Sequence, residues 1–224
     1  HHFPRLMPNR TDPNLDSFSG SFSQLPINAL ADASLRARED DVLRVLSQGR
    51  ARSLHDFAVL LSPDATDHLE AMARLSQQIS QQHFGKTMRL FAPIYLSNEC
   101  VNICKYCGFS KNNDIPRITI SEEQALAETQ KLSRQGIRSM LIVAGEHPKY
   151  VSNGYVKRIV EQSLPIMPTL SIELGPMKTE EYQPIVEAGC ESLIAYQETY
   201  HRPTYEELHT SGPKQFYNWR LDTV

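Results

Sequence analysis

Four short apolar runs alternate with amphipathic helical patterns in the second half of the chain, and this alternation constrains the fold more than any other feature. The runs span residues 90–96, 139–144, 169–174 and 192–196. Helical patterns separate them: one opens with a capping box at Ser121 and closes at Gly136, one runs from about 155 to 164, and one is capped by Thr179 and stops at Gly189. Strands that alternate with helices pair in parallel through right-handed crossovers. We therefore expect an α/β fold, a partial TIM-type (βα) barrel of about four βα units.

The chain before these strands is of a different kind. Residues 1–28 are rich in Pro, Ser and Asn, so we expect a mobile tail. Residues 29–85 predict three helices, the second capped by Ser53 and the third ending near Gly85. Their apolar residues at helical spacing, expected to form a core, are Leu35, Val42, Leu43, Leu46, Leu54, Phe57, Leu60, Leu61, Leu69, Met72, Leu75 and Ile79. Residues 86–224 would form the barrel domain, which is truncated at half of an eight-unit barrel.

Charge and composition exclude several classes of function. A net charge of -3, from 23 basic and 26 acidic residues among 224, gives no signal for nucleic acid or for an anionic membrane. No apolar run of about 18 residues is present to span a bilayer, and the N-terminus lacks the apolar part of a secretory signal. We therefore expect a soluble, cytoplasmic protein. Four cysteines are a poor disulfide framework for this length, and clustered thiols indicate metal binding or catalysis.

Three of the four cysteines fall in one loop directly after the first predicted strand: Cys100, Cys104 and Cys107. Thiolates are soft ligands that select zinc, copper(I) or iron–sulfur clusters. The fourth, Cys190, precedes the last predicted strand, so it should lie at the opposite end of the sheet as a buried structural thiol. The loop therefore offers three thiolates and no local fourth.

Two kinds of metal centre are compatible with three thiolates. A structural zinc would need a fourth ligand, for which His147 or His201 is available. An iron–sulfur cube with one non-cysteine corner would instead leave that iron open for a small molecule. The C-x3-C-x2-C spacing favours the cluster, because zinc sites usually show C-x2-C pairs.

Polar residues follow or close each predicted strand. They are the cysteine loop and residues 145–147, 173–175 and 197–201. In a βα barrel the active site lies at the carboxyl ends of the strands. We therefore expect these four segments to meet on one face and to form an active site around the cysteine loop.

The cysteine spacing, with the aromatic Tyr106 before the last cysteine, resembles the signature of the radical S-adenosylmethionine superfamily. The resemblance implies that the three cysteines hold a 4Fe-4S cluster. It implies further that the amino and carboxylate groups of S-adenosyl-L-methionine bind the fourth iron. An electron from the reduced cluster would then cleave this cofactor to a 5′-deoxyadenosyl radical.

Longer phrases are similar to the 2-iminoacetate synthase family, the tyrosine lyases of thiamine thiazole biosynthesis. They are A-P-I-Y-L-S-N, C-G-F-S-K-N-N, A-G-E-H-P, Y-Q-E-T-Y-H, G-P-K and W-R-L-D-T. The resemblance implies that the radical removes a hydrogen from the amino group of L-tyrosine, and that the Cα–Cβ bond breaks to give 2-iminoacetate (dehydroglycine) and p-cresol. The implied partners are L-tyrosine, a thiazole synthase that takes up dehydroglycine, and a flavodoxin- or ferredoxin-type reductant.

The family implies roles for four cofactor-binding residues. Tyr106 would lie beside the adenine, with a core aromatic as its alternative role. Gly145 and Glu146 would contact the amino group of S-adenosylmethionine, although Ala144 replaces the first glycine of the family's turn. Glu173 would bind ribose hydroxyls or the methionyl amine. An exposed loop position for Glu146 and a strand-end ion pair for Glu173 are the alternatives.

Five further residues are candidates for the substrate pocket and catalysis: Tyr95, Gln197, Glu198, Tyr200 and His201. The last four close the fourth predicted strand. Their alternative role is to cap the helix that follows.

Two other functions are compatible with the sequence. The tyrosine lyase of hydrogenase-cofactor maturation is similar through these regions, but it carries a second cysteine cluster near a C-terminus that this chain lacks. From another class, the chain could be a non-catalytic, truncated metal-binding module. We expect the family function to be encoded here. Because a half-barrel exposes a strand edge and an apolar face, inactivity of the chain alone is an open alternative.

Overall fold

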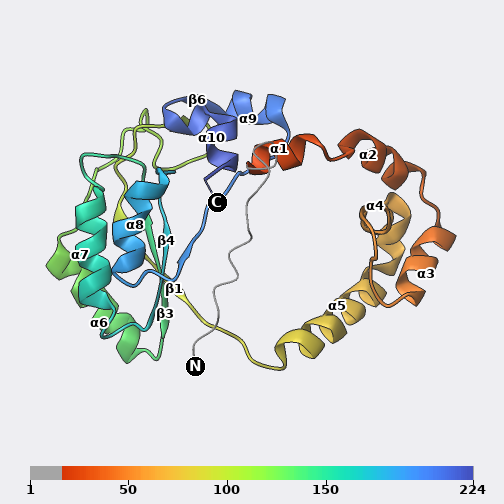
Figure 1. The fold of residues 1–224 in the computed structure, drawn as a ribbon, viewed down its shortest axis with the longest axis horizontal. Coiled ribbons are helices and arrows are strands. Elements are labelled where there is room, and N and C mark those ends of the chain that lie inside the picture. Colours follow the sequence, from red (N-terminus) through yellow and green to blue (C-terminus); the bar gives the residue numbers. More distant parts are fainter. Residues whose placement is uncertain (1–16, 224) are drawn as a thin grey trace. The chain divides into compact units, whose positions relative to one another are not determined.

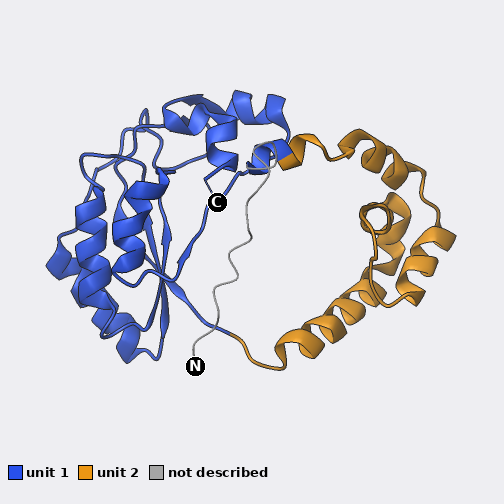
Figure 2. Cartoon of the chain, in the orientation of Figure 1, with its two compact units in different colours: residues 1–20, 89–224 blue, residues 21–88 orange. Residues whose placement is uncertain are grey.

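The computed structural model describes residues 17–223, which divide into two compact units (Figures 1 and 2). Unit 2 comprises residues 21–88, and unit 1 comprises the described residues before and after it. Most of the expected tail, residues 1–16, lies outside the described residues. Its remaining part contains helix α1 (Phe18–Ser23) and the start of α2 (Ile27–Arg36). No helix within residues 17–223 is long and apolar enough to cross a membrane.

A parallel sheet of four strands forms the centre of unit 1, in the order β1-β3-β4-β5. The strands are β1 (Ala92–Ser97), β3 (Ser139–Ala144), β4 (Thr169–Glu173) and β5 (Ser192–Leu193). The register pairs Tyr95 with Val143 and Val143 with Glu173, so the carboxyl ends of three strands lie side by side. The expected α/β architecture with four parallel strands is confirmed.

Three crossover helices cover one face of this sheet (Figure 1). They are α6 (Glu122–Arg134), α7 (Asn153–Ser163) and α8 (Thr179–Glu187). The predicted capping box of α6 is present: Ser121 Oγ accepts from the Gln124 backbone N–H, and Gln124 Oε1 accepts from that of Ser121. The expected cap at Thr179 is wrong, because that residue is already helical. Glu181 accepts the backbone N–H of Lys178 at 2.8 Å, which starts α8 one residue earlier.

The two faces of the sheet differ in burial. In β1, Ile94 and Leu96 are buried against the helices, whereas Tyr95 on the opposite face is 56% exposed. Alternate residues of a strand point to opposite faces, so this pattern marks the helix-covered face as the core. From β3, Met140 and Ile142 are fully buried there, and burial of each contributes about 1.5–3 kcal/mol. The opposite face of the sheet is more exposed.

A two-stranded antiparallel sheet joins the cysteine loop to the last part of unit 1. The elements involved are β2 (Ile103–Cys104), α9 (Arg202–Leu208), β6 (His209–Ser211), η2 (Pro213–Gln215) and α10 (Tyr217–Leu221). Strands of two or three residues show no periodicity, so these pairings were not predictable from the sequence pattern. The fourth predicted strand, 192–196, is also shorter than expected, because β5 pairs only at Ser192 and Leu193.

Unit 2 is helical. After α2 it contains α3 (Glu39–Ser47), α4 (Leu54–Leu60), η1 (Pro63–His68) and α5 (Leu69–Phe84). Two predicted boundaries are confirmed: Ser53 caps α4, and α5 ends at Gly85, which has φ +68°. The first predicted helix is instead two helices. Arg38 is extended, and its N–H donates to the carboxylate of Asp41, which starts α3 afresh.

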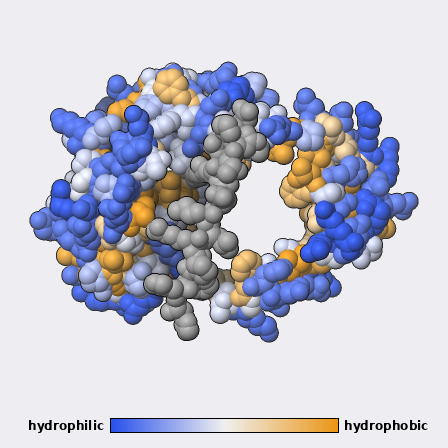
Figure 3. Space-filling model, viewed as in Figure 1, coloured by the Kyte–Doolittle hydropathy of each residue, from blue (hydrophilic) through white to orange (hydrophobic). Residues whose placement is uncertain are grey.

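The core expected for unit 2 is only partly right. Of the expected members, Val42 is fully buried, but Leu35 is 71% and Leu61 63% exposed. Val45 and Val59 are buried as well, and they were not expected. The other exposed members of the expected core are Leu43, Leu54, Phe57 and Leu69. Figure 3 shows apolar side chains at the surface of this unit. The buried cluster of unit 2 is small, and the short helices around it bury only the apolar residues that face it. The remaining apolar residues of each helix stay exposed.

Candidate active site at the cysteine loop

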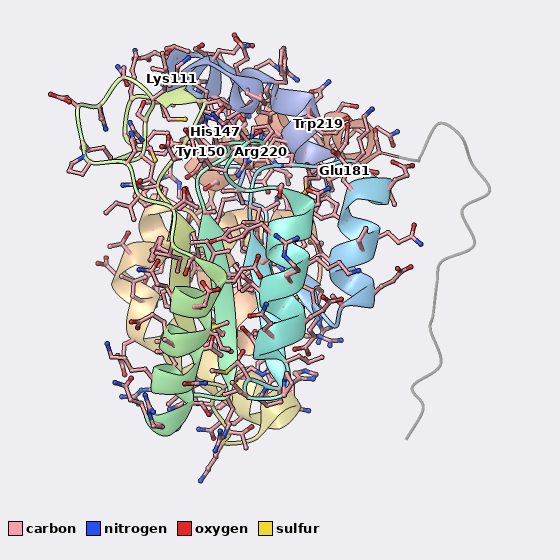
Figure 4. The ribbon with its side chains drawn as sticks, turned by 90° about the vertical axis from the view of Figure 1, so that its left-hand side faces the viewer. Lys111, His147, Tyr150, Glu181, Trp219 and Arg220 are labelled. Carbon is pink, nitrogen blue, oxygen red and sulfur yellow. The ribbon has the colours of Figure 1, made fainter. Side chains whose placement is uncertain are left out.

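A pocket of about 190 Å³ lies where the cysteine loop meets the carboxyl ends of β3 and β4. Eight of the residues singled out from the sequence line it: Cys100, Cys104, Tyr106, Cys107, Gly145, Glu146, Glu173 and Glu198. Figure 4 shows His147 and Arg220 at this same end of the sheet. Segments that are far apart in the sequence therefore contribute to one pocket.

Tyr95 and Gln197 do not line this pocket. Tyr95 lies on the more exposed face of β1, edge-on to Phe109 with their ring centroids 6.1 Å apart. Gln197 is 7% exposed, and neither its side-chain nitrogen nor its oxygen has a hydrogen-bond partner among residues 17–223. A buried amide without a partner is costly, so Gln197 is suited to bind a polar group.

Tyr200 and His201 also lie outside the pocket lining. The backbone oxygen of Tyr200 accepts a hydrogen bond from the Tyr217 hydroxyl at 2.9 Å. His201 directly precedes α9, and its Nδ1 lies 2.8 Å from Thr204 Oγ1. Both residues thus connect to the helices that follow β5, in keeping with the alternative of a helix-end role.

The guanidinium of Arg117 fastens the cysteine loop. Its Nη1 donates to the backbone oxygens of Asn98 and Phe109, and its Nη2 donates to those of Ser110 and Asn113, at 2.8 to 3.0 Å. Five fixed donors allow one arginine to satisfy several loop carbonyls that no regular element pairs. The loop is held from both sides of the cysteines.

The three loop cysteines are free thiols. Burial raises the pKa of the Cys104 thiol to about 11, and the Lys214 ammonium opposes this rise. Cys190 lies outside the pocket, is 7% exposed and donates from Sγ to the backbone oxygen of Ser192. The prediction of a buried structural thiol at Cys190 is confirmed, and the pocket holds three thiols.

The donor set fits an iron–sulfur cube better than a single zinc ion. Among residues 17–223, the pocket lining contains three cysteines and no histidine, so a zinc ion would find no fourth cysteine or histidine there, whereas a cube with one open iron needs only three thiolates. The histidines considered as a fourth zinc ligand do not line the pocket: His147 packs edge-on to Tyr150 (Figure 4), and His201 contacts Thr204.

Glu146 is held at the pocket wall by one hydrogen bond and by close packing against a glycine. Asn102 Nδ2 donates to Glu146 Oε2 at 2.7 Å. A Cβ atom on Gly175 would overlap the Glu146 side chain, so this position needs glycine for the carboxylate to keep its place. Gly145 is needed for another reason, because a Cβ atom there would overlap the backbone oxygen of Glu99 in the cysteine loop.

Charged groups of both signs face the pocket. Lys214 Nζ donates to Glu198 Oε1 at 2.7 Å, and Arg220 also lines the pocket. Burial disfavours the charge of Glu198, but Lys214 and Arg220 outweigh it, so the pKa of this carboxyl lies below its usual value. Burial and the nearby charge of Glu198 raise the pKa of Glu173. Carboxylates beside cations suit a ligand that carries both an ammonium and a carboxylate.

Tyr106 is tied to β6. Its hydroxyl lies 2.6 Å from His209 Nε2, and His209 Nδ1 lies 2.7 Å from the backbone oxygen of Tyr205. A carbonyl only accepts, so Nδ1 carries the proton and Nε2 accepts from the tyrosine O–H. Burial raises the pKa of Tyr106 and lowers that of His209, which keeps both neutral. The Tyr106 ring is therefore fixed at the pocket.

Five residues of this site were missed from the sequence: Asn102, Arg117, His209, Lys214 and Arg220. Two of them lie in phrases already noted, since Lys214 ends G-P-K and Arg220 is part of W-R-L-D-T. Arg117 carries no local signal because it bonds to backbone oxygens, which any residue supplies. Asn102 and His209 carry none because the pocket residues that they contact are distant in the sequence. His209, for example, contacts Tyr106 across more than a hundred positions.

Comparisons with known proteins agree with this site. No family model matches the chain. It is 37% identical over 183 residues to 2-iminoacetate synthase of Escherichia coli (strain K12), covering 82% of this chain and 48% of that protein. The resemblance to 2-iminoacetate synthase is confirmed. The protein of the same name from Salmonella typhimurium (strain LT2) is 38% identical over 183 residues, with the same shares covered.

A solved structure extends the comparison to the fold. The crystal structure of HydG, a maturase of the [FeFe]-hydrogenase, matches with a TM-score of 0.81 and 27% identity, over 87% of this chain and 45% of that one. This match supports the partial-barrel fold predicted from the alternating strands and helices. The chain spans about half the length of the curated 2-iminoacetate synthases it matches.

Proposed function

We propose that the chain carries the cluster- and cofactor-binding part of a radical S-adenosylmethionine lyase. This lyase would cleave L-tyrosine to 2-iminoacetate and p-cresol for the thiazole of thiamine. The observation that carries the proposal is the pocket, which combines three free thiols with the carboxylate of Glu146. The identity of 37% to 2-iminoacetate synthase supports the choice of reaction.

The cofactor roles follow from the pocket lining. Cys100, Cys104 and Cys107 would hold a 4Fe-4S cluster. When bound, this cluster supplies the electron that cleaves S-adenosylmethionine to a 5′-deoxyadenosyl radical. Glu146 would accept hydrogen bonds from the cofactor's ammonium group, a charge-assisted contact. Tyr106, 46% exposed and anchored through its hydroxyl, would offer its ring to the adenine.

The remaining pocket carboxylates would bind polar parts of the cofactor or substrate. Glu198 is kept ionised by Lys214, so it can accept from an ammonium or a hydroxyl. Glu173, whose pKa is raised, would accept from ribose hydroxyls. Gly145 would allow the backbone after β3 to approach the cofactor.

Tyr95 and Gln197 are proposed to contact L-tyrosine. Tyr95 lies beside Phe109, which lines the pocket, and the partnerless amide of Gln197 can both donate and accept. Tyr200 and His201 would act from the start of α9, at the edge of the substrate site. A thiazole synthase and a flavodoxin- or ferredoxin-type reductant are proposed as partners, on the resemblance to 2-iminoacetate synthase. Free thiols suit a reducing compartment such as the cytoplasm.

A second candidate is the tyrosine lyase of hydrogenase-cofactor maturation. The TM-score of 0.81 with HydG favours it as an alternative. This reaction would also release p-cresol, but it would convert dehydroglycine further to carbon monoxide and cyanide. Analysis of the one-carbon products therefore separates the two candidates.

The test is an anaerobic assay with S-adenosylmethionine, L-tyrosine and dithionite. It is run with this chain after anaerobic reconstitution. We expect p-cresol and 5′-deoxyadenosine together, without carbon monoxide or cyanide. Formation of 5′-deoxyadenosine without p-cresol would mean that tyrosine is the wrong substrate. Absence of both products would overturn the proposed function.

A further inference from the structure

Asn102 lies inside the cysteine loop, two positions after its first cysteine, and it is 2% exposed. Both the nitrogen and the oxygen of its side-chain amide form hydrogen bonds. Nδ2 donates to Glu146 Oε2 at 2.7 Å and to Cys100 Sγ at 3.6 Å, and Oδ1 accepts the backbone N–H of Lys214 at 2.9 Å. One side chain therefore joins a cysteine, a pocket carboxylate and the segment after β6.

The orientation of the amide is fixed by its partners. A backbone N–H can only donate and an ionised carboxylate can only accept, so the oxygen must face Lys214 and the nitrogen must face Glu146. The second hydrogen of Nδ2 is then free for Cys100. Aspartate has the same shape but would place a second carboxylate against Glu146. An amide is the side chain that satisfies all three partners.

The surrounding backbone is built to keep Asn102 in place. The backbone N–H of Lys111 donates to the backbone oxygen of Asn102 at 2.8 Å. The backbone N–H of Val101 donates to the backbone oxygen of Glu146, also at 2.8 Å. Gly212 has φ +87°, and a Cβ atom there would overlap Asn102 Oδ1. The chain after β6 thus packs directly against the amide, with no room for another side chain.

We propose that Asn102 is a positioning residue that links the ligand-binding carboxylate of Glu146 to the cluster ligand Cys100. The proposal rests on the proposed function. Hydrogen bonds to cysteine sulfur raise the reduction potential of an iron–sulfur cluster, because they stabilise the more negative reduced state. The hydrogen bond to Glu146 fixes the orientation in which its carboxylate would accept the ammonium group of S-adenosylmethionine. Asn102 therefore acts on the ease of cluster reduction and on the affinity for S-adenosylmethionine.

The experiment uses the anaerobically reconstituted protein and two measurements. The midpoint potential of the cluster is measured by EPR-monitored titration without S-adenosylmethionine, and the Kd for S-adenosylmethionine by equilibrium binding. The variants are Asn102→Ala, which removes all three contacts, and Asn102→Asp, which keeps the shape and the acceptor for Lys214. The matched control is Asn98→Ala. Asn98 Nδ2 donates to the backbone oxygen of Pro116, and Asn98 Oδ1 accepts the backbone N–H of Ile118, so this amide serves the same loop without bonding to a cysteine or to Glu146.

We expect both Asn102 variants to have a more negative midpoint potential and a Kd raised about 10- to 100-fold, as for other partners of cluster and metal ligands. Asn98→Ala should match the wild type in both. In a Glu146→Gln background, Asn102→Ala should weaken binding no further and should still lower the potential. This pattern separates the two contacts of the amide.

Three outcomes would count against these proposals. Wild-type potential and Kd in both Asn102 variants would overturn the role of Asn102. Loss of the cluster from both Asn102 variants, with normal loading of Asn98→Ala, would also overturn it, because Asn102 would then only hold the loop. A wild-type protein that takes up no 4Fe-4S cluster would instead overturn the proposed function itself.

Discussion

Single side chains with several hydrogen bonds hold the site together at the residue scale. Arg117 binds four loop carbonyls, and Asn102 binds a sulfur, a carboxylate and a backbone N–H. Motif spacing identified the cysteines because adjacent ligands leave a local pattern. It did not identify Asn102, Lys214 or Arg220, whose roles depend on partners brought close only by the fold.

Gly175→Ala should weaken the binding of S-adenosylmethionine by roughly tenfold or more. The added Cβ would overlap Glu146 and displace its carboxylate, and loss of about 1.4 kcal/mol corresponds to a factor of ten. Iron loading should be unaffected, because the cysteines stay in place. The measurement is the Kd of the reconstituted variant.

The control for this change is Gly108→Ala, where an added Cβ meets no atom within 4 Å. It should bind S-adenosylmethionine as the wild type does. Equal affinity of Gly175→Ala and wild type would show that the position of Glu146 does not govern binding.

At the scale of elements, caps and turns were more predictable than burial. Ser53, Ser121 and Gly85 mark helix ends where expected, because their hydrogen bonds and φ angles are local properties. Burial in unit 2 was less predictable, since it depends on which neighbours cover each helix. Leu35 and Leu61 fit a helical stripe and are nevertheless exposed. The pair β2 and β6 was missed because its strands are too short to show a period.

Asp56→Asn should lower the thermal stability of unit 2 near neutral pH. The backbone N–H of Arg52 and the guanidinium of Arg44 bind its carboxylate at 3.0 and 3.2 Å, and they hold its pKa below the usual value. The pKa of Asp56 in the folded protein therefore lies below its value in the unfolded chain, which is about 3.9. The charged carboxylate stabilises the fold above about pH 4, and this stabilisation is lost as the pH falls through the folded pKa.

Circular dichroism melts of the variant and the wild type check this prediction. The difference in Tm should be largest near neutral pH and should shrink below about pH 4. The control Asp67→Asn changes an exposed carboxylate and should have little effect at either pH. A Tm difference for Asp56→Asn that is the same at both pH values would contradict the role of its charge.

For the whole molecule, the order of strands and helices was enough to predict a parallel α/β sheet, and the strand ends were enough to predict where polar residues meet. The pocket at the cysteine loop is the result of that topology. The details after β5 were not predictable, because the chain there leaves the βα repeat: Glu198 has φ +71°, and β6 returns to pair with the cysteine loop. That departure brings Lys214 and Arg220 to the pocket.

The central claim is that the cysteine loop holds a 4Fe-4S cluster that binds S-adenosylmethionine. Its most direct test is the EPR spectrum of the anaerobically reconstituted, reduced protein, before and after addition of S-adenosylmethionine. We predict a cluster signal that shifts on addition, that is retained in Cys190→Ala and that is lost in Cys104→Ala. A colourless protein with one bound zinc, or a signal that depends on Cys190 and not on Cys104, would contradict the claim.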